Sequence, residues 1–91
     1  MYDRVYSARF KRDLRLSQKQ GRDLSLLITV IDILAIGATL PLEYYDHPLK
    51  GNYKGYRECH IEPDWLLIYK IDKGLLVLLL ARTGAHSDLF R

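Results

Sequence analysis

Three histidines and one carboxylate are the side chains of this 91-residue sequence best suited to acid–base chemistry. His47 precedes a proline, His60 lies four positions before Asp64, and His86 is close to the C-terminus. Histidine can donate or accept a proton near neutral pH because its ordinary pKa is about 6.5. Asp64 could orient a histidine and stabilise its charged form, or act as a base itself. Together these residues predict a site for proton transfer.

Basic and aromatic neighbours indicate that the substrate is a phosphate ester. Arg82 and Lys50 could hold a phosphate through charge-assisted hydrogen bonds, and Phe90 or Tyr56 could stack on a base. RNA carries its own nucleophile, the 2′-OH. Its cleavage requires a base for that proton, an acid for the leaving 5′-oxygen, and charge stabilisation at the phosphate. The residue types present could supply all three.

Each of these side chains also has a structural interpretation when it is considered alone. A histidine before a proline, such as His47, often caps a loop, and a strand histidine such as His60 is often structural. Asp64 follows a proline and could be only a turn residue. Trp65, Tyr69 and the single cysteine are expected in the core. The functional interpretation therefore depends on the residues acting as a group.

The composition predicts one small cytoplasmic domain that spans residues 1–91. The net charge is +3, and residues 1–22 carry seven basic and two acidic side chains, a local charge of +5. The single cysteine excludes an internal disulfide and is typical of a reducing compartment. No signal peptide is expected, and polar residues interrupt the apolar run Leu24–Leu42, which makes it a poor membrane span.

Two helices are expected in the N-terminal half. Ser7 can cap the first helix, on which Phe10, Leu14 and Ser17 share one side. The opposite side is basic, and it is formed by Arg12, Arg15, Lys19 and Arg22. This basic side is either a solvated face or a surface for nucleic acid or an acidic partner.

The second helix should begin after Asp23 and end at Gly37. It carries two apolar stripes and only a narrow polar edge, so it should be buried on most sides. A sheet could cover one stripe. The first helix or a partner protein could cover the other.

The C-terminal half predicts a sheet. After a loop over residues 44–52, strands are expected at Tyr56–Ile61, Trp65–Ile71 and Leu75–Arg82, in addition to a brief strand within residues 1–6. Gly74 should take a positive φ in the hairpin turn Asp72-Lys73-Gly74. The last strand is almost entirely Leu and Val, which predicts an internal strand. The expected fold is α+β in the order β-α-α-β-β-β, with a helical hairpin on one face of an antiparallel sheet.

Three spaced motifs in the C-terminal half resemble the YafQ branch of the RelE/ParE toxin superfamily. They are Asp46-His47-Pro48-Leu49-Lys50-Gly51, the run Gly55–Tyr69 with Cys59-His60-Ile61-Glu62-Pro63-Asp64-Trp65 at its centre, and Arg82-Thr83-Gly84-Ala85-His86-Ser87-Asp88-Leu89-Phe90. The helical hairpin agrees with the family in order and length.

The resemblance implies a toxin of a type II toxin–antitoxin system that cleaves messenger RNA on the ribosome and inhibits translation. It implies a cognate antitoxin of the DinJ/RelB kind, and it implies functional roles for His47, His60, Asp64, His86 and Phe90, with Glu58 also implicated. We expect His86 to be the acid, His47 or Asp64 the base, and His60 a phosphate or orientation contact. The residues expected to bind RNA are Lys50, Lys54, Glu58, Arg82 and Phe90. No cofactor is expected.

Two other functions have to be weighed. The first is a non-catalytic binding module, because relatives of the ParE kind act on gyrase without cleaving RNA; three histidines aligned with an acid–base motif argue against it. The second is a metal site built from His47, His60, Asp64 and His86. The sequence has no H-x-x-x-H ligand pair, so a metal site is not expected.

Overall fold

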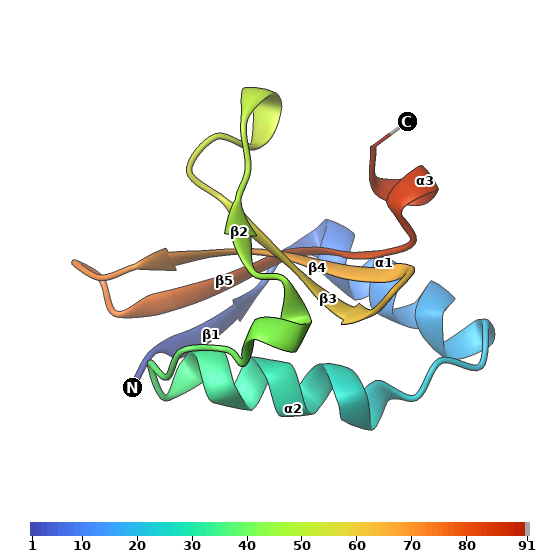
Figure 1. The fold of residues 1–91 in the computed structure, drawn as a ribbon, viewed down its shortest axis with the longest axis horizontal. Coiled ribbons are helices and arrows are strands. Elements are labelled where there is room, and N and C mark those ends of the chain that lie inside the picture. Colours follow the sequence, from blue (N-terminus) through green and yellow to red (C-terminus); the bar gives the residue numbers. More distant parts are fainter. Residues whose placement is uncertain (91) are drawn as a thin grey trace.

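The protein forms one five-stranded sheet with two helices against it (Figure 1). The structure is a computed structural model and describes residues 1–90. The elements are β1 (Asp3–Tyr6), α1 (Ala8–Lys19), α2 (Leu24–Ala35), β2 (His47–Pro48), β3 (Arg57–Glu62), β4 (Trp65–Asp72), β5 (Val77–Gly84) and α3 (His86–Leu89). Short 3-10 turns at Leu42–Tyr44 and Gly51–Tyr53 flank β2. The strand order is β1-β5-β4-β3-β2.

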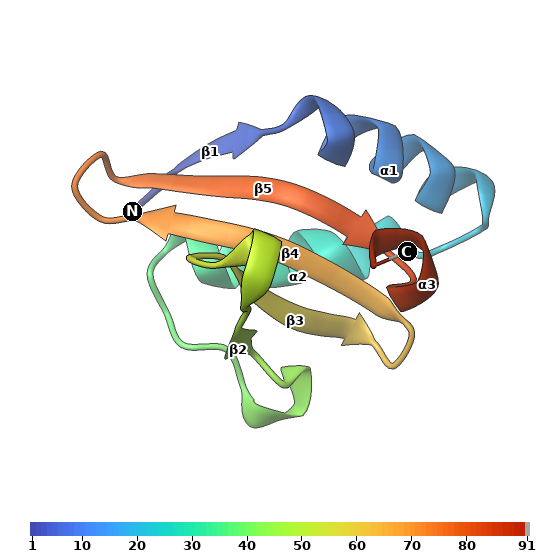
Figure 2. The same ribbon diagram turned by 90° about the horizontal axis from the view of Figure 1, so that it is seen from above.

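Both long helices contribute to one apolar core on the same side of the sheet, as the sequence predicts. α2 lies across that face, and α1 runs along the edge of β5 beyond β1 (Figures 1 and 2). Phe10 of α1 and Leu27 of α2 join Trp65 and Tyr69 of β4 in one apolar core. These four side chains are at most 1% exposed. Burial of such large side chains supplies most of the stabilisation of a domain this small.

Local capping explains where the helices begin. The side chain of Ser7 accepts a hydrogen bond from the Phe10 amide at 2.9 Å, and that of Asp23 accepts one from the Ser25 amide at 3.0 Å. Both N-caps were predicted. The Ser25 hydroxyl also donates to Asp23, and the two hydrogen bonds from Ser25 lower the pKa of the Asp23 carboxyl. The expected buried side of α1 is confirmed, with Phe10 and Ser17 buried.

The expected fold class is confirmed, with two differences in the sheet. β1 pairs with β5 in parallel, so the sheet is mixed. Only strands joined by a tight turn must run antiparallel, and the chain leaves β1 directly into α1. In addition, His47 and Pro48 form the short edge strand β2, within a segment expected to be a loop. Pro48 is tolerated there because an edge strand leaves one side without ladder bonds.

The turn between β4 and β5 differs from the prediction. It runs over residues 73–76, and Leu76 rather than Gly74 has a positive φ, of 54°. The Asp72 side chain accepts from the Leu75 amide at 3.0 Å, which closes the turn through a side chain instead. Leu75 and Leu76 are exposed, so β5 begins later than expected. Its internal position between β1 and β4 is confirmed.

The other face of the sheet carries no long helix. Leu66 and Ile68 of β4 are covered by Leu89 of α3 and by partly buried side chains that include Tyr53 and Tyr56. The segment around β2 and the short helix α3 both rise from this face (Figure 1). Within residues 1–90, no helix is long and apolar enough to cross a membrane.

Candidate active site

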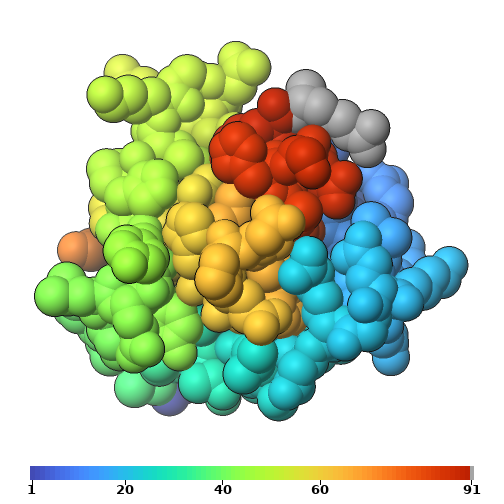
Figure 3. All heavy atoms as spheres, turned by 45° about the vertical axis from the view of Figure 1, so that its right-hand side comes forward, coloured from blue at the N-terminus to red at the C-terminus, as the bar shows by residue number. Residues whose placement is uncertain are grey.

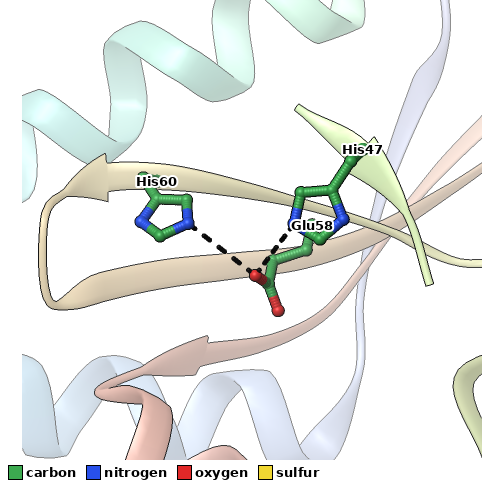
Figure 4. A group of neighbouring side chains, drawn as sticks. All are labelled: His47, Glu58 and His60. Carbon is green, nitrogen blue, oxygen red and sulfur yellow. Dashed lines mark ion pairs between the residues drawn. The ribbon is translucent and has the colours of Figure 1, made fainter. Parts of the chain in front are cut away.

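A buried carboxylate lies between two histidines on the face of the sheet that the long helices leave open. The carboxylate oxygen Oε1 of Glu58 is 3.3 Å from Nε2 of His47 and 3.9 Å from Nε2 of His60 (Figure 4). Glu58 is 5% exposed, whereas the side chain of His47 is 47% exposed. We refer to His47, Glu58 and His60 as the histidine–carboxylate cluster. A carboxylate in this position can accept a hydrogen bond from an imidazole N–H.

Strand geometry brings the cluster together. Glu58 and His60 point to the open face of the sheet, while the alternate residues Cys59 and Ile61 point into the helix-covered core. That alternation was predicted. His47 lies directly opposite Glu58 in the β2–β3 pair, so both side chains share a face. Burial raises the pKa of the Cys59 thiol, which makes it an unreactive core residue.

Asp46 anchors the segment that carries His47. It accepts a hydrogen bond from the Tyr69 hydroxyl at 2.6 Å, and Arg57 Nε approaches the same oxygen at 3.3 Å. Burial and the bond to Asp46 raise the pKa of the Tyr69 hydroxyl, and Asp46 raises the pKa of the Arg57 guanidinium. Tyr69 therefore stays a hydrogen-bond donor and holds Asp46 against the sheet. Asp46 begins the first of the three sequence motifs, but no role was predicted for it.

Each cluster histidine has a second polar neighbour. Nδ1 of His60 is 3.2 Å from the Pro63 carbonyl, and Nδ1 of His47 is 3.3 Å from the Pro48 carbonyl. A carbonyl can only accept, so these contacts are hydrogen bonds when Nδ1 carries a proton. The Tyr45 ring meets the His60 ring edge-on with centroids 5.8 Å apart. The orientation of both rings is therefore restrained by the protein.

A pocket of about 670 Å³ opens beside the two histidines. It is lined by Glu43, Tyr44, Tyr45, His47, His60, Ile61, Glu62 and Pro63. Tyr45 adopts a left-handed backbone conformation with φ 48°, which is uncommon for a residue other than glycine. This tyrosine is a candidate contact for a nucleobase that the sequence analysis missed, because its place beside His60 depends on the path of the loop.

Asp64 and His86 meet at the start of α3. The Asp64 side chain accepts a long hydrogen bond of 3.4 Å from the His86 backbone amide. Gly84 precedes this turn with φ 154°, and an added Cβ would lie 3.4 Å from Leu89 Cδ2. A residue with a side chain would be strained there, so Gly84 lets α3 fold back onto the sheet. Asp64 thus connects the β3–β4 hairpin to the helix that carries His86.

Arg22 supports this hairpin from the helical side. It donates to the Asp64 carbonyl at 3.3 Å, and its guanidinium lies 5.3 Å from the centroid of the Trp65 ring. The sequence analysis placed Arg22 on the basic side of α1. In the structure it follows that helix and stacks on the sheet instead. Figure 3 shows the β3–β4 hairpin at the surface between the loop before β2 and α3.

The predicted RNA-binding residues lie on two segments. Lys50 and Lys54 are exposed and flank the 3-10 turn Gly51–Tyr53. Phe90 follows α3, and its ring is 4.9 Å from the His86 ring and 5.9 Å from the Tyr53 ring, between centroids. Glu58 belongs instead to the histidine–carboxylate cluster.

Arg82 is held by a carboxylate that the sequence analysis did not connect to it. Its Nε donates to Asp13 at 2.7 Å and one Nη donates to the other oxygen at 3.2 Å. The bond to Asp13 raises the pKa of Arg82. The Thr83 amide also donates to Asp13, at 3.1 Å, so this contact fastens α1 to the end of β5. Its role as a phosphate contact stays a prediction.

The cluster also has the composition of a metal site. One ligand atom from each of His47, Glu58 and His60 lies within 4.8 Å of the others, the one such group found within residues 1–90. Imidazole and carboxylate together suit zinc and copper. The ligand set considered from the sequence was His47, His60, Asp64 and His86, and the missing H-x-x-x-H pair is a spacing found on helices. The ligand set that the structure brings together arises from strand alternation and a cross-strand pair.

Known proteins resemble this chain over its whole length. The family profile described as "Bacterial toxin of type II toxin-antitoxin system, YafQ" matches residues 2–91. The mRNA interferase toxin YafQ of Escherichia coli strain K12 is 47% identical over 90 residues, which cover 97% of this chain and 95% of that protein. A putative toxin YafQ of Haemophilus influenzae is 44% identical over 88 residues, 91% of this chain and 86% of that protein.

Solved structures agree with the fold. The toxin in the E. coli DinJ–YafQ complex superposes with a TM-score of 0.91 at 41% identity and full coverage of both chains. A metal-bound toxin from Helicobacter pylori superposes with a TM-score of 0.93 at 47% identity, covering 99% of this chain and 100% of that one.

Proposed function

Because this chain belongs to the YafQ family of toxins from type II toxin–antitoxin systems, we propose that it is an endoribonuclease that cuts messenger RNA on the ribosome. The E. coli relative is named an mRNA interferase toxin, and the similarity extends over nearly the whole of both chains. The structural observation that carries the proposal is the histidine–carboxylate cluster on an open sheet face, beside a pocket and within the same surface as α3.

The reaction begins with removal of the proton from the substrate's 2′-OH. His47 is the better placed of the two candidate bases, because it lies on β2 while His86 lies on α3, and these segments rise from different parts of the same face (Figure 1). Nε2 of His47 donates to Glu58 at 3.3 Å, so Nδ1 is the nitrogen that takes the proton from the 2′-OH. Asp64, the other candidate base, adjoins the His86 amide and holds α3 in place. An acid and a base on separate segments suit an in-line displacement.

The leaving 5′-oxygen takes its proton from His86, which is exposed at the first turn of α3. His60 contacts the phosphate or orients the substrate, with its Nε2 3.9 Å from Glu58. Lys50 and Lys54 stabilise charge on the RNA backbone from the loop after β2. Phe90, packed against His86, stacks on a base and fixes the nucleotide beside the acid. The products are a 2′,3′-cyclic phosphate, or the 3′-phosphate formed from it, and a 5′-hydroxyl.

A cognate antitoxin is the expected protein partner. The E. coli relative is seen in complex with DinJ. In this chain, Leu26, Ile28 and Ile36 in or beside α2 are 40%, 53% and 60% exposed, so the apolar side of α2 extends beyond what the sheet covers. An acidic antitoxin segment would bury these residues and meet the basic α1. We propose that it covers this helical surface or the open face of the sheet.

Induced expression tests the function. The chain is expressed with and without the gene upstream of its own, and messenger RNA ends are mapped in both cultures. Without the antitoxin, growth should stop and new 5′-hydroxyl ends should appear inside translated reading frames. A reporter whose start codon has been removed should stay intact, since ribosomes do not read it. Equal cleavage of the untranslated reporter would contradict ribosome dependence, and 5′-phosphate ends would contradict 2′-OH attack.

A further inference from the structure

Two adjoining pockets lie between the start of α1, the loop after β2 and strand β5, away from the histidine–carboxylate cluster on β2 and β3. The inner one, of about 320 Å³, reaches Tyr56, Leu79 and Ala81 on the open sheet face. The outer one, of about 560 Å³, reaches Asp88 and Leu89 of α3. Both are lined by Arg9, Asn52, Tyr53 and Arg82, and we call these four residues the Arg9 groove. Volumes of this order suit a small ligand or part of a larger one, since ligand pockets begin at about 300 Å³.

The groove contains a cation without an acidic partner. Within residues 1–90, no carboxylate lies within ion-pair distance of Arg9, whereas Arg82 is bound by both oxygens of Asp13. Arg9 is exposed in the first turn of α1, next to the Ser7 cap. Asp88 adds a negative charge to the outer pocket only. Because Arg9 lines both pockets and Asp88 only one, an anion would be attracted most strongly to the pocket that lacks Asp88.

The other groove residues suit a nucleobase. Tyr53 meets Tyr56 with ring centroids 5.9 Å apart, and the walls behind them are the apolar Leu79 and Ala81. Such a pocket accepts the flat face of a base. Asn52 is exposed at the rim, and its amide can donate to and accept from a base edge. As an acceptor, Asp88 could bind a ribose hydroxyl in the outer pocket.

The groove is continuous with the site of the proposed reaction. The Tyr53 ring contacts Phe90, whose ring in turn contacts His86. A strand of RNA whose scissile phosphate is at His86 would pass Phe90 and then reach Tyr53. The loop that carries Asn52 and Tyr53 also carries the exposed Lys50 and Lys54.

We propose that the Arg9 groove binds one nucleotide of the messenger RNA that flanks the cleaved bond, and that this subsite contributes to sequence preference. The base enters the inner pocket against Tyr53 with Asn52 at its edge, and Arg9 contacts its phosphate. Arg82, held by Asp13, lines the same groove. The inference rests on the proposed function, since the nucleotide belongs to the RNA that His86 helps to cleave.

The phosphate contact is tested by pairing a protein change with a substrate change. Messenger RNAs with one neutral methylphosphonate at successive positions around the cleavage site are bound to ribosomes, and kcat/KM is measured for the wild type and for Arg9→Gln. At one position, the methylphosphonate should lower the wild-type kcat/KM about 5- to 10-fold. Arg9→Gln should lower kcat/KM on unmodified RNA by a similar factor. In Arg9→Gln the same methylphosphonate should have no further effect, because the two changes remove one contact.

Lys11→Gln is the matched control. Lys11 loses the same charge from the same helix, but it lies two residues along and lines neither pocket of the groove. Its kcat/KM should change less than twofold. The proposal would be overturned if Arg9→Gln and Lys11→Gln lowered kcat/KM equally. It would also be overturned if, at every methylphosphonate position, the effects of the substrate change and of Arg9→Gln on kcat/KM were additive. Either result would indicate diffuse attraction of RNA.

The base contact is tested with Asn52→Ala, which is exposed and should leave folding unchanged. When this variant cleaves a library of codons, its preference for particular bases at one flanking position should be weaker than that of the wild type. The total cleavage rate should fall only a few-fold. An unchanged preference at every position would refute base recognition in the groove. If the wild type cuts messenger RNA normally and these variants behave like it, the subsite is wrong and the nuclease assignment stands. If the wild type itself does not cut, both fail.

Discussion

The side chain of Asp46 should have two separable effects, one on stability and one on catalysis. Asp46→Ala leaves the Tyr69 hydroxyl without its acceptor, and Tyr69 is 1% exposed. An unsatisfied buried hydroxyl costs about 1–3 kcal/mol. The lost contact with Arg57, whose side chain is 41% exposed, adds at most about 1 kcal/mol. A domain of this size loses about 4–8 °C of melting temperature per kcal/mol. We therefore expect the melting temperature to fall by roughly 4–30 °C, with folding retained at 25 °C.

The double variant Asp46→Ala/Tyr69→Phe separates the two effects. Removing both partners of a buried hydrogen bond is far less costly than removing one. The double variant should therefore be more stable than Asp46→Ala alone. Its activity should stay low, because the segment that carries His47 has lost its anchor in both variants. A displaced catalytic group lowers the rate by about 10- to 100-fold.

Thermal unfolding followed by circular dichroism and single-turnover cleavage at 25 °C measure the two effects. A double variant that melted no higher than Asp46→Ala would refute the role of Asp46 as the acceptor for Tyr69. The anchoring role of Asp46 would be refuted if Asp46→Ala cut messenger RNA at the wild-type rate, since His47 would then need no anchor.

Four other variants or conditions test further parts of the proposed site and fold. His86→Ala should slow cleavage about 10²–10⁴-fold while the circular dichroism spectrum and antitoxin binding stay unchanged, and full toxicity or an unfolded protein would refute this. Thr83→Val should lower stability by about 1–3 kcal/mol without changing the rate per folded molecule, because the buried Thr83 hydroxyl accepts from Trp65 Nε1 at 2.9 Å; equal denaturation midpoints would contradict it. Micromolar zinc should inhibit cleavage through the histidine–carboxylate cluster and chelator should restore it, whereas chelator alone should leave the wild-type rate on naked RNA unchanged. The free energy of unfolding should fall above about pH 9. Folding raises the pKa values of Cys59 and Tyr69, so the unfolded chain loses these protons at a lower pH than the folded chain and becomes more favourable as the pH rises. A Tyr69→Phe variant should therefore lose less stability as the pH rises from 10.

Much of the fold follows from local rules. Ser7 and Asp23 cap the helices where their side chains predict, and the alternation along β3 sends Glu58 and His60 to one face. These features depend on residues within one turn or one strand. β2 depends instead on pairing at the sheet edge, which a two-residue segment with a proline does not reveal. The parallel pairing of β1 depends on the path of the chain through both helices.

The candidate site was predictable in composition but not in its connections. The residue types and the family resemblance predicted the histidines, Asp64 and Glu58 as site residues, and the structure brings His47, Glu58 and His60 together. The contact between His47 and Glu58 requires the register of β2 against β3, and Asp13 meets Arg82 across 69 positions of sequence. No local pattern encodes either contact. For the same reason the sequence did not connect Asp46 to Tyr69, or place Arg9 and Tyr53 in one groove.

In the proposed mechanism, His47 and His86 promote cleavage of RNA by attack of the substrate's own 2′-OH. The most direct measurement uses ribosome-bound messenger RNA with a single 2′-deoxyribose at the nucleotide just upstream of the cleaved bond. The substrate should bind as tightly as unmodified RNA and remain uncut, while a deoxy nucleotide one position further upstream should be cut normally. Cleavage of the first substrate at the unmodified rate would show that another nucleophile attacks and that the roles assigned to both histidines are wrong.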